Sequence, residues 1–490
     1  MAHVYAFLSD SARRHPDKTF VTDRGRDWTF GEISRRSAAI AGGLLASGVQ
    51  PGSRVLLYFD NCAEYIASYF AVLLLNAIVV PVHKNLTIET RRHIICQTQP
   101  KMILTSAAFQ RRLHDVDGDI VRVVDFGVPM DAGHQGIQDE PEEADDVPAL
   151  ILYTSGTTRL PKGVTLTHRN LSANTASILS YLDLTADDSL LAVVNFAYSY
   201  GNSLLLTHAK AGARLVLENA TAYPAQVLKA LLESRVTGFS TVGSYLAVLL
   251  RQGALGADHL RFLRYVTFAG ESTSADDLKQ LASLAPGLRI FVMYGQTEAS
   301  ARLSYLDPAL LFDKPGSIGK AIPGVVLRVV SEDGLPARPG EWGELVAAGE
   351  NIMKGYWNDE DATRDVLVAG WLHTGDLAYT DEDGFLYIKG RKDDIIKYMG
   401  HRISPAEIEA AVNSCPKVLE SAVVAVFDGP APRIKTFVVL KEDAGAGEIE
   451  AHVRRLLPSY KRPHIYEIID ALPRTASGKI KRSTLRNGII

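Results

Sequence analysis

The sequence predicts a large layered α/β domain followed by a small α+β domain. The chain has 490 residues, more than one ordinary hydrophobic core supports, so two or more domains are expected. Over the first 390 residues, short β-rich apolar runs alternate with amphipathic helical stretches, which is typical of layered α/β architecture. After Arg391 the pattern changes to a smaller mixed set of strands and helices.

The strands of the large domain are expected at β-rich apolar runs, at residues 54–58, 149–152, 214–217, 265–268 and 289–293. The uncharged run at 65–82 reaches the lower length limit of a membrane-spanning helix. Because Asn76 and Pro81 interrupt that run and its end is β-rich, we interpret it as a buried helix that leads into a buried strand.

The small domain is expected to begin with a helix that Ser404 and Glu407 cap reciprocally, with Pro405 at its first position. Strands are expected at 421–427, 434–440 and 465–469, and a helix at 447–457. The polar segment 391–394 suits a hinge, which divides the chain into domains 1–390 and 395–490. Such a lid domain indicates an enzyme that closes over its substrate.

Composition favours a cytoplasmic globular protein. The apolar fraction is 47%, the charged fraction is 22% and the net charge is −4. No secretory signal is expected at the N-terminus. The cysteines Cys62, Cys96 and Cys415 are widely spaced, so we interpret them as buried apolar residues in a reducing compartment. The basic tail at 474–486 lacks interleaved aromatic residues, which favours a small phosphate-bearing partner over nucleic acid.

A phosphate-binding loop is predicted at residues 151–163 (ILYTSGTTRLPKG), where an apolar strand leads into small donors and one lysine. Backbone N–H groups and hydroxyls can surround phosphate oxygens, and a lysine neutralises their charge. The spacing is not that of a Walker loop, and the alternative is an ordinary Ser/Thr/Gly turn. The candidate phosphate ligands are Thr154, Ser155, Gly156, Thr157, Thr158 and Lys162.

Three further segments follow in order: YGQTE at 294–298, GWLHTGDL at 370–377 running into 384–402, and PRTASGKIKR at 473–482. Together with the phosphate loop they resemble the AMP-forming adenylating superfamily, which includes acyl-CoA synthetases, adenylation domains and luciferases. The resemblance covers essentially the whole chain. It implies the same fold, a large ATP- and acid-binding domain with a small mobile lid.

The resemblance also implies roles for individual residues. Tyr294 and Gly295 would lie against adenine, with Gly270 and Glu271 on an adjacent adenine-side loop. Thr297 would contact the α-phosphate, and Glu298 would carry Mg²⁺, a cation that takes few carboxylates besides phosphate oxygens.

In the second half of the pattern, Asp376 would bind the ribose hydroxyls with support from Arg391, although the two could instead form a structural ion pair. Asp393 would be the hinge residue, and Gly400 would line the path of the pantetheine arm. Lys479 matches the catalytic lysine that bridges the acyl carboxylate and the α-phosphate.

The resemblance implies that residues 193–201 line part of the acyl pocket, where Phe196, Tyr198 and Tyr200 offer aromatic surface. Tyr198 falls where many relatives carry a gating histidine. The segment 241–245 (TVGSY), which includes Gly243 and Ser244, would line the other wall. Residues 190–217 contain no Asp or Glu, which disfavours a free α-amino acid because its ammonium would be buried unpaired. An alkyl or aryl carboxylic acid is expected.

One departure from the family pattern is Arg159, which stands where the phosphate loop usually has glycine. An arginine there would carry strain if the position needs positive φ, or its guanidinium would contact the pyrophosphate. Retained activity is expected.

The predicted activity is a two-step ligation that uses ATP and Mg²⁺. The acid forms an acyl-adenylate, and coenzyme A then takes the acyl group and releases AMP. The alternative acceptor is the phosphopantetheine of a carrier protein. A luciferase-type oxygenase or an inactive nucleotide-binding regulator would also carry an adenylate-binding pattern. Neither nucleic acid nor a membrane span is expected, and a homodimer is an alternative to a monomer.

Overall fold

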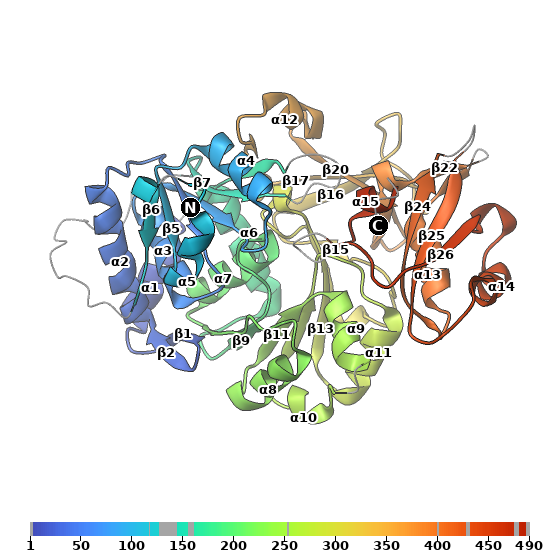
Figure 1. Cartoon of the computed structure of the whole chain (residues 1–490), viewed down its shortest axis with the longest axis horizontal. Helices are drawn as coiled ribbons and strands as arrows, with labels where there is room; N and C mark the ends of the chain where they lie inside the picture. Colours follow the sequence, from blue (N-terminus) through green and yellow to red (C-terminus); the bar gives the residue numbers. More distant parts are fainter. Residues whose placement is uncertain are drawn as a thin grey trace. The chain divides into compact units, whose positions relative to one another are not determined.

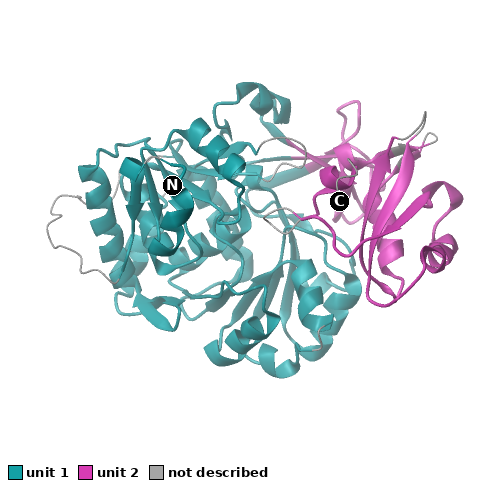
Figure 2. Cartoon of the chain, in the orientation of Figure 1, with its two compact units in different colours: residues 1–154, 161–327, 347–372 teal, residues 155–160, 328–346, 373–490 magenta. Residues whose placement is uncertain are grey.

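The computed structural model describes residues 3–116, 118–126, 145–154, 161–251, 254–398, 401–427, 432–474 and 480–486. They fall into two compact units, shown in Figure 2. Unit 1 contains the described residues up to 327 together with 347–372, and unit 2 contains 328–346 and those from 373 onward. The predicted fold class is confirmed, since both units mix helices and sheets. The hinge at 391–394 stays a prediction.

Unit 1 contains a nine-stranded sheet in the order β15-β14-β13-β12-β11-β9-β10-β1-β2. Its strands from β13 to β1 are parallel, and β2, β14 and β15 add antiparallel edges. The predicted strands β10, β12 and β13 are all present, as buried apolar runs typical of a parallel sheet. The bounds are β1 Thr19–Asp23, β2 Arg26–Thr29, β9 Ser189–Ala192, β10 Arg214–Leu217, β11 Gly238–Thr241, β12 Tyr265–Phe268, β13 Arg289–Tyr294, β14 Ser304–Leu306 and β15 Lys320–Ala321.

A second sheet of unit 1 has seven strands in the order β18-β8-β7-β4-β3-β5-β6. The predicted strands at 54–58 and 149–152 correspond to β3 and β7. Strands β7 and β8 pair antiparallel and lie on either side of the predicted phosphate loop in the sequence, and β18 pairs with β8 at its outer edge. The bounds are β3 Arg54–Tyr58, β4 Ile78–Val82, β5 Met102–Thr105, β6 Val121–Val123, β7 Pro148–Tyr153, β8 Gly163–Thr167 and β18 Gly355–Tyr356.

The helices of unit 1 pack on these sheets and on each other, α2 on α3 and α1 and α6 on α7. In Figure 1, α8, α9, α10 and α11 lie beside β11 and β13. Helices α2, α3, α4 and α6 begin at side-chain caps, as where Thr29 and Glu32 cap α2 reciprocally. The bounds are α1 Ala6–Arg14, α2 Phe30–Ala46, α3 Ala63–Leu74, α4 Ile88–Thr98, α5 Ala107–Gln110, α6 His168–Leu182, α7 Ser199–Ala211, α8 Pro224–Ser234, α9 Gly243–Arg251, α10 Ala257–Leu260, α11 Ala275–Leu284 and α12 Glu360–Val366. Short 3-10 turns are η1 Arg111–Leu113, η2 Gly118–Ile120, η3 Thr297–Ala299 and η4 Pro308–Leu310.

The uncharged run at 65–82 forms most of α3 and then β4, so its interpretation as a buried helix and strand is confirmed. Residues of α3 from Tyr65 to Leu74 are buried, because β-strands and helix α2 cover the helix. Within the described residues, no helix is both long and apolar enough to span a bilayer.

A five-stranded sheet has the order β16-β17-β20-β19, with β21 paired to the other part of β20. Unit 2 adds the hairpin of β22 and β23, and a three-stranded sheet of β24, β25 and β26. The strands are β16 Val325–Val330, β17 Gly343–Gly349, β19 Leu367–Val368, β20 Trp371–Thr380, β21 Leu386–Arg391, β22 Ile396–Tyr398, β23 His401–Ile403, β24 Val418–Val426, β25 Arg433–Leu440 and β26 Ile465–Ile468. The helical segments are η5 Lys392–Asp394, α13 Pro405–Asn413, α14 Ala446–Leu456, η6 Ser459–Lys461 and α15 Arg482–Arg486.

The helix predicted after Ser404 is confirmed, with Ile408, Ala411 and Val412 buried, but the capping box is wrong. Ser404 makes no side-chain cap and instead donates its hydroxyl to the carbonyl of Lys389 at 2.5 Å. The Glu407 carboxylate pairs with Lys461. Tertiary partners therefore replace the local reciprocal bonds.

The prediction of three buried cysteines is also partly wrong. Cys62 and Cys415 are buried thiols, but Cys96 lies on the exposed side of α4. Burial holds the pKa of the Cys62 thiol well above its ordinary value, which keeps it protonated and unreactive.

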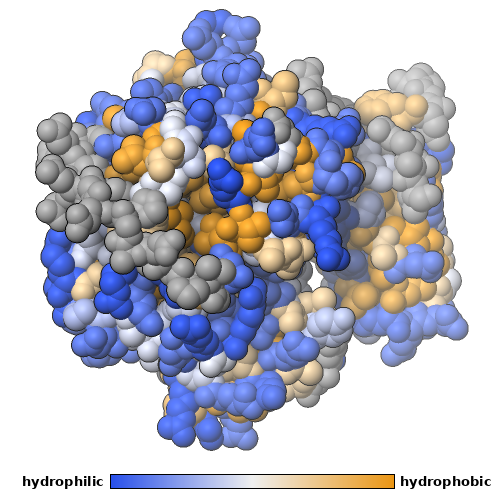
Figure 3. All heavy atoms as spheres, turned by 60° about the vertical axis from the view of Figure 1, so that its left-hand side comes forward, coloured by the Kyte–Doolittle hydropathy of each residue, from blue (hydrophilic) through white to orange (hydrophobic). Residues whose placement is uncertain are grey.

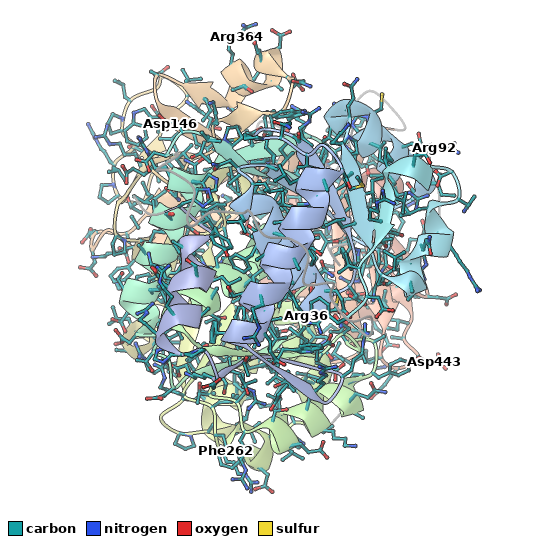
Figure 4. All side chains as sticks on the ribbon, turned by 90° about the vertical axis from the view of Figure 1, so that its left-hand side faces the viewer. Arg36, Arg92, Asp146, Phe262, Arg364 and Asp443 are labelled. Carbon is teal, nitrogen blue, oxygen red and sulfur yellow. The ribbon has the colours of Figure 1, made fainter. Side chains whose placement is uncertain are left out.

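Polar and apolar side chains share the face of unit 1 that Figure 3 draws. In Figure 3, hydrophilic side chains cover most of its drawn face and apolar ones form smaller areas between them. Figure 4 shows Arg92 and Arg364 at the edge of the view. Arg36, on α2, lies in front of the central part of the chain in the same view. Its guanidinium stands 4.9 Å from the ring of Trp28 and 4.1 Å from that of Phe126.

Candidate active site

The candidate site lies where the parallel strands β10, β9, β11, β12 and β13 end. Their carboxyl ends meet at one edge of the nine-stranded sheet because neighbouring strands run in the same direction. In open α/β sheets ligands bind outside this edge. The loops after these strands carry Phe196, Gly243, Gly270 and Thr297 among the predicted residues, so the topology brings them together.

The loop after β13 is compact and holds its carboxylate in a defined place. Tyr294 ends the strand, and Gly295 follows where an added Cβ would stand 1.8 Å from the carbonyl oxygen of Ala301. Thr297 and Glu298 begin the turn η3, and the Thr297 hydroxyl donates to Ser199 Oγ at 3.3 Å. The loop thus needs glycine at its closest approach.

Glu298 is held by a residue that the sequence analysis missed. Tyr356 in β18 donates its hydroxyl to Glu298 Oε1 at 2.9 Å. The same ring lies 4.8 Å from the ammonium of Lys162, which immediately precedes β8. The predicted phosphate lysine and the predicted metal ligand are therefore brought together around one tyrosine.

The chain segments on either side of the predicted phosphate loop are joined where the Thr154 amide donates to the carbonyl of Lys162 at 3.0 Å. Gly163 follows, and an added Cβ there would lie 2.9 Å from Ile151 and 3.0 Å from the ring of Tyr153. The loop's remaining predicted ligands lie outside the described residues; they are Ser155, Gly156, Thr157 and Thr158, with Arg159 beside them.

The loops after β11 and β12 contact each other. Glu271 accepts a hydrogen bond from the Ser244 amide at 2.5 Å, and Gly270 has φ +95°, a conformation that favours glycine. An added Cβ at Gly243 would stand 2.7 Å from the carbonyl oxygen of Ser272. Gly243, Ser244, Gly270 and Glu271 therefore form one packed corner of the site.

The three aromatic residues after β9 differ in environment. Phe196 is fully buried in the core, 5.9 Å from the ring of Tyr65, and Tyr200 is buried with its hydroxyl bonded to Thr267 Oγ1 at 2.7 Å and Thr267 O at 2.9 Å. Tyr198 is half-buried, and its hydroxyl has no hydrogen-bond partner among the described residues. It is the one of the three with a hydroxyl left for a ligand.

Tyr198 stacks on His83, with ring centroids 5.2 Å apart and planes inclined by 29°. Burial lowers the pKa of His83 to about 4, so the imidazole is neutral at physiological pH. Burial likewise raises the pKa of Tyr198. The pair is thus a neutral aromatic surface.

Two further residues lie at this edge: Tyr245 belongs to the segment 241–245 that was expected to line the acyl pocket, whereas Glu218 had no sequence signal beyond its position after a strand. Tyr245, in the first turn of α9, has a buried hydroxyl without a partner among the described residues. Burial and the nearby charge of Glu218 raise its pKa to about 12. Glu218 directly follows β10, one position beyond the segment without acidic residues, and accepts the Ala220 amide at 2.7 Å.

Unit 2 carries the predicted ribose-binding pair on adjacent strands. Asp376 in β20 and Arg391 in β21 are register partners, with Arg391 Nη1 3.4 Å from Asp376 Oδ1 and 2.9 Å from Thr374 O. Gly375, which directly precedes Asp376, has φ +71°, and a Cβ added there would lie 3.1 Å from the guanidinium of Arg391. The fold therefore brings this predicted pair together.

Glu344 is another residue that the sequence analysis missed. Its carboxylate accepts Lys392 Nζ at 3.1 Å and the Gly375 amide at 3.2 Å, and His373 Nδ1 lies 3.3 Å away. Burial opposes the negative charge, but Lys392 and His373 hold the pKa of Glu344 below its ordinary value. Glu344 thereby links the chain before Asp376 to the predicted hinge.

The predicted hinge residue Asp393 is exposed in η5, and Asp394 beside it accepts a hydrogen bond from Arg486 at 2.5 Å. Gly400 and Lys479 lie outside the described residues.

The described residues fit Mg²⁺ held together with nucleotide phosphates rather than in a protein cage. No group of three or more His, Cys, Asp or Glu side chains suited to a metal occurs among them. Glu298 and Thr297 offer hard oxygen donors, and Glu298 Oε2 is not used by Tyr356. Mg²⁺ is commonly bound by one or two carboxylates plus substrate phosphates.

Comparison with protein families matches residues 8–357 to the model described as "AMP-binding enzyme" and residues 407–479 to "AMP-binding enzyme C-terminal domain". A feruloyl-CoA synthase from Amycolatopsis sp. is 35% identical over 97% of this chain and 96% of its own length. A long-chain-fatty-acid–CoA ligase from Bacillus subtilis is 31% identical, over 98% and 94%.

Among solved structures, the o-succinylbenzoate coenzyme A synthetase of Bacillus subtilis in complex with ATP and a magnesium ion superposes with a TM-score of 0.86. It is 29% identical and covers 99% of this chain and 98% of its own.

Proposed function

Because this chain belongs to the family of AMP-binding enzymes and is an AMP-forming acid–CoA ligase, we propose that it acts on an aryl carboxylic acid. The acid's carboxylate attacks the α-phosphorus of ATP, and pyrophosphate leaves. The thiol of coenzyme A then attacks the carbonyl carbon of the acyl-adenylate, and AMP leaves with the electrons of the broken C–O bond.

We propose the following roles for the residues of the site. Lys162 neutralises phosphate charge, Thr297 binds the α-phosphate and Glu298 holds Mg²⁺, which offsets charge on the phosphates when bound. The support is their position around Tyr356 and at the end of β13.

On unit 2, Asp376 binds the ribose hydroxyls and Arg391 orients it, in keeping with their 3.4 Å contact. Lys479 stabilises the charge that develops at the α-phosphate, and Asp393 is the hinge about which the small domain moves between the two half-reactions. Gly400 lines the path of the pantetheine arm.

An aryl acid is supported by the surface of the predicted acyl pocket. The Tyr198–His83 stack is aromatic and neutral, and Tyr245 and Glu218 place polar groups on the loops after β11 and β10, on either side of β9. A substrate ring that bears a hydroxyl can hydrogen-bond to these polar groups, since a phenol donates to a carboxylate or to a tyrosine oxygen. Two similar ligases are named for feruloyl and o-succinylbenzoate, both of which contain an aromatic ring, and these names support an aryl acid.

The long-chain aliphatic acid is the alternative substrate, as the name of another relative indicates. The acceptor is coenzyme A, as in the similar ligases, and a homodimer stays an alternative to a monomer. We also propose a cytoplasmic location, because the three cysteines, all of them described residues, are free thiols.

Acid-dependent ATP–pyrophosphate exchange tests the proposal. The panel contains hydroxylated and unsubstituted cinnamic and benzoic acids, long-chain aliphatic acids and amino acids, each with wild type and with Lys479→Ala. Exchange is expected with hydroxylated aryl acids and to fall at least ~10²-fold in Lys479→Ala. Exchange only with aliphatic acids would contradict the aryl assignment, and full exchange in the variant would contradict the role of Lys479.

A further inference from the structure

We infer that Tyr356 is a positioning residue that holds the metal-binding carboxylate of Glu298 and the phosphate-binding ammonium of Lys162 in one arrangement. Its hydroxyl donates to Glu298 Oε1 at 2.9 Å, and its ring centroid lies 4.8 Å from Lys162 Nζ. One neutral side chain thus contacts both oppositely charged groups. The inference rests on the proposed function, which assigns these groups to the metal and the phosphates.

The backbone of Tyr356 is fixed independently of both groups. Tyr356 pairs with Val164 in the β18–β8 ladder, and its amide donates to Thr363 Oγ1 at 2.8 Å. The next amide, of Trp357, donates to the carbonyl of Gly163 at 2.6 Å. Because its main chain is already ordered, binding Glu298 restrains only the side-chain torsions of Tyr356 and no additional backbone.

The segment that carries Tyr356 also braces the turn that carries Glu298. The Met353 amide donates to Glu298 O at 2.8 Å, and Asn351 Nδ2 donates to Ala299 O at 3.1 Å and to Arg302 O at 2.9 Å. Ser300 Oγ in turn donates to Asn351 O at 2.7 Å. Residues 351–356 therefore hold the main chain of η3, and the Tyr356 hydroxyl extends this support to the carboxylate.

A neutral donor suits this position. A carboxylate accepts about four hydrogen bonds, so one bond from Tyr356 orients Glu298 and leaves Oε2 for a cation without cancelling the negative charge. The aromatic face attracts the Lys162 ammonium by its quadrupole. Tyr356 therefore orders both charged groups through separate parts of one side chain.

The two contacts of Tyr356 are separable by substitution. Tyr356→Phe removes the hydroxyl and keeps the ring under Lys162, whereas Tyr356→Leu removes both. Tyr58→Phe is the matched control, since that hydroxyl donates to the carbonyl of Lys84 outside the site.

The affinity for ATP, measured by calorimetry with Mg²⁺ and again with EDTA, reports both contacts without turnover. For Tyr356→Phe we expect roughly tenfold weaker binding of MgATP, as for one lost hydrogen bond to a charged acceptor, and less than about twofold change with EDTA. Tyr356→Leu is expected to weaken metal-free ATP as well, by about two- to fivefold, because Lys162 loses its aromatic partner. Tyr58→Phe is expected to change neither value.

The inference would be overturned if Tyr356→Phe changed the affinity for ATP equally with Mg²⁺ and with EDTA, or changed neither affinity. A melting temperature of Tyr356→Phe far below that of Tyr58→Phe would also overturn it, because the bond would then serve stability. Combined with Glu298→Gln, Tyr356→Phe is expected to have no further effect on MgATP affinity. If Glu298→Gln alone leaves the effect of Mg²⁺ intact, the assigned metal role of Glu298 fails, which is a result distinct from failure of the tyrosine.

Discussion

Replacing Gly295 by alanine is expected to disable adenylation by displacing the loop after β13. The φ of Gly295 is not positive, so the cost comes from contact and not from backbone conformation. The added Cβ would lie 1.8 Å from Ala301 O, 2.7 Å from Ala301 C and 2.9 Å from Arg302 Cα. All three are main-chain atoms, which no rotamer change can move away.

The size of the effect follows from these distances. Normal Cβ contacts begin above 3.0 Å, so the two main-chain segments must separate by more than 1 Å. Thr297 and Glu298 are two and three residues beyond Gly295 and move with it. A misplacement of about 1 Å can reduce a rate about 10²-fold, and overpacking costs ~1–3 kcal/mol in stability.

Exchange of ATP with pyrophosphate, together with thermal melting, measures both effects. Gly43→Ala is the control, because Gly43 lies inside α2 and its added Cβ meets no atom within 4 Å. That control is expected to keep full activity and to gain about 0.5–1 kcal/mol in stability. Wild-type exchange and melting in Gly295→Ala would refute the steric reasoning.

Three other predictions concern stability, the hinge and the phosphate loop. Burial alone would raise the pKa of Asp188, but Arg264 and neighbouring donors lower it below its ordinary value. The charged carboxylate therefore stabilises the fold at pH values above the ordinary Asp pKa, and this contribution is lost as the pH falls through the pKa of Asp188 in the folded protein. Asp188→Asn should therefore cost about 1–3 kcal/mol in unfolding at pH 7 and far less at pH 3; an equal loss at both would contradict the charge argument. Asp393→Pro is expected to spare one half-reaction, measured by pyrophosphate exchange and by CoA-dependent AMP release, and to impair the other; equal loss of both would argue against a hinge there. Arg159→Gly is expected to leave exchange near wild type, and a large gain in turnover would show that the arginine is a handicap.

Strands of the parallel sheets were predictable because their signal is local. The bounds of β3, β10 and β12 match the apolar runs, since a strand buried on both faces needs continuous apolar side chains and ends where polar or glycine residues return. The four motifs likewise identified the family, because loops that approach a nucleotide are restricted in both residue type and spacing.

Local rules failed where a distant partner was available. Ser404 and Glu407 have the spacing of a capping box, yet the hydroxyl binds Lys389 O and the carboxylate binds Lys461. Cys96 has an apolar side chain, but it lies on the exposed side of α4. In each case the outcome depends on which element packs alongside, and residue type does not contain that information.

The sequence by itself determined the family, the two-step ligase chemistry and the more apolar strands, because each depends on residues within short stretches of chain. Only the tertiary structure decided which side chains act together. Tyr356 and Glu298 are 58 residues apart, and the unpartnered hydroxyls of Tyr198 and Tyr245, among the described residues, come from separate loops. Strand order at one sheet edge brings such residues together, and that order is set by the packing of the whole sheet rather than by any single segment.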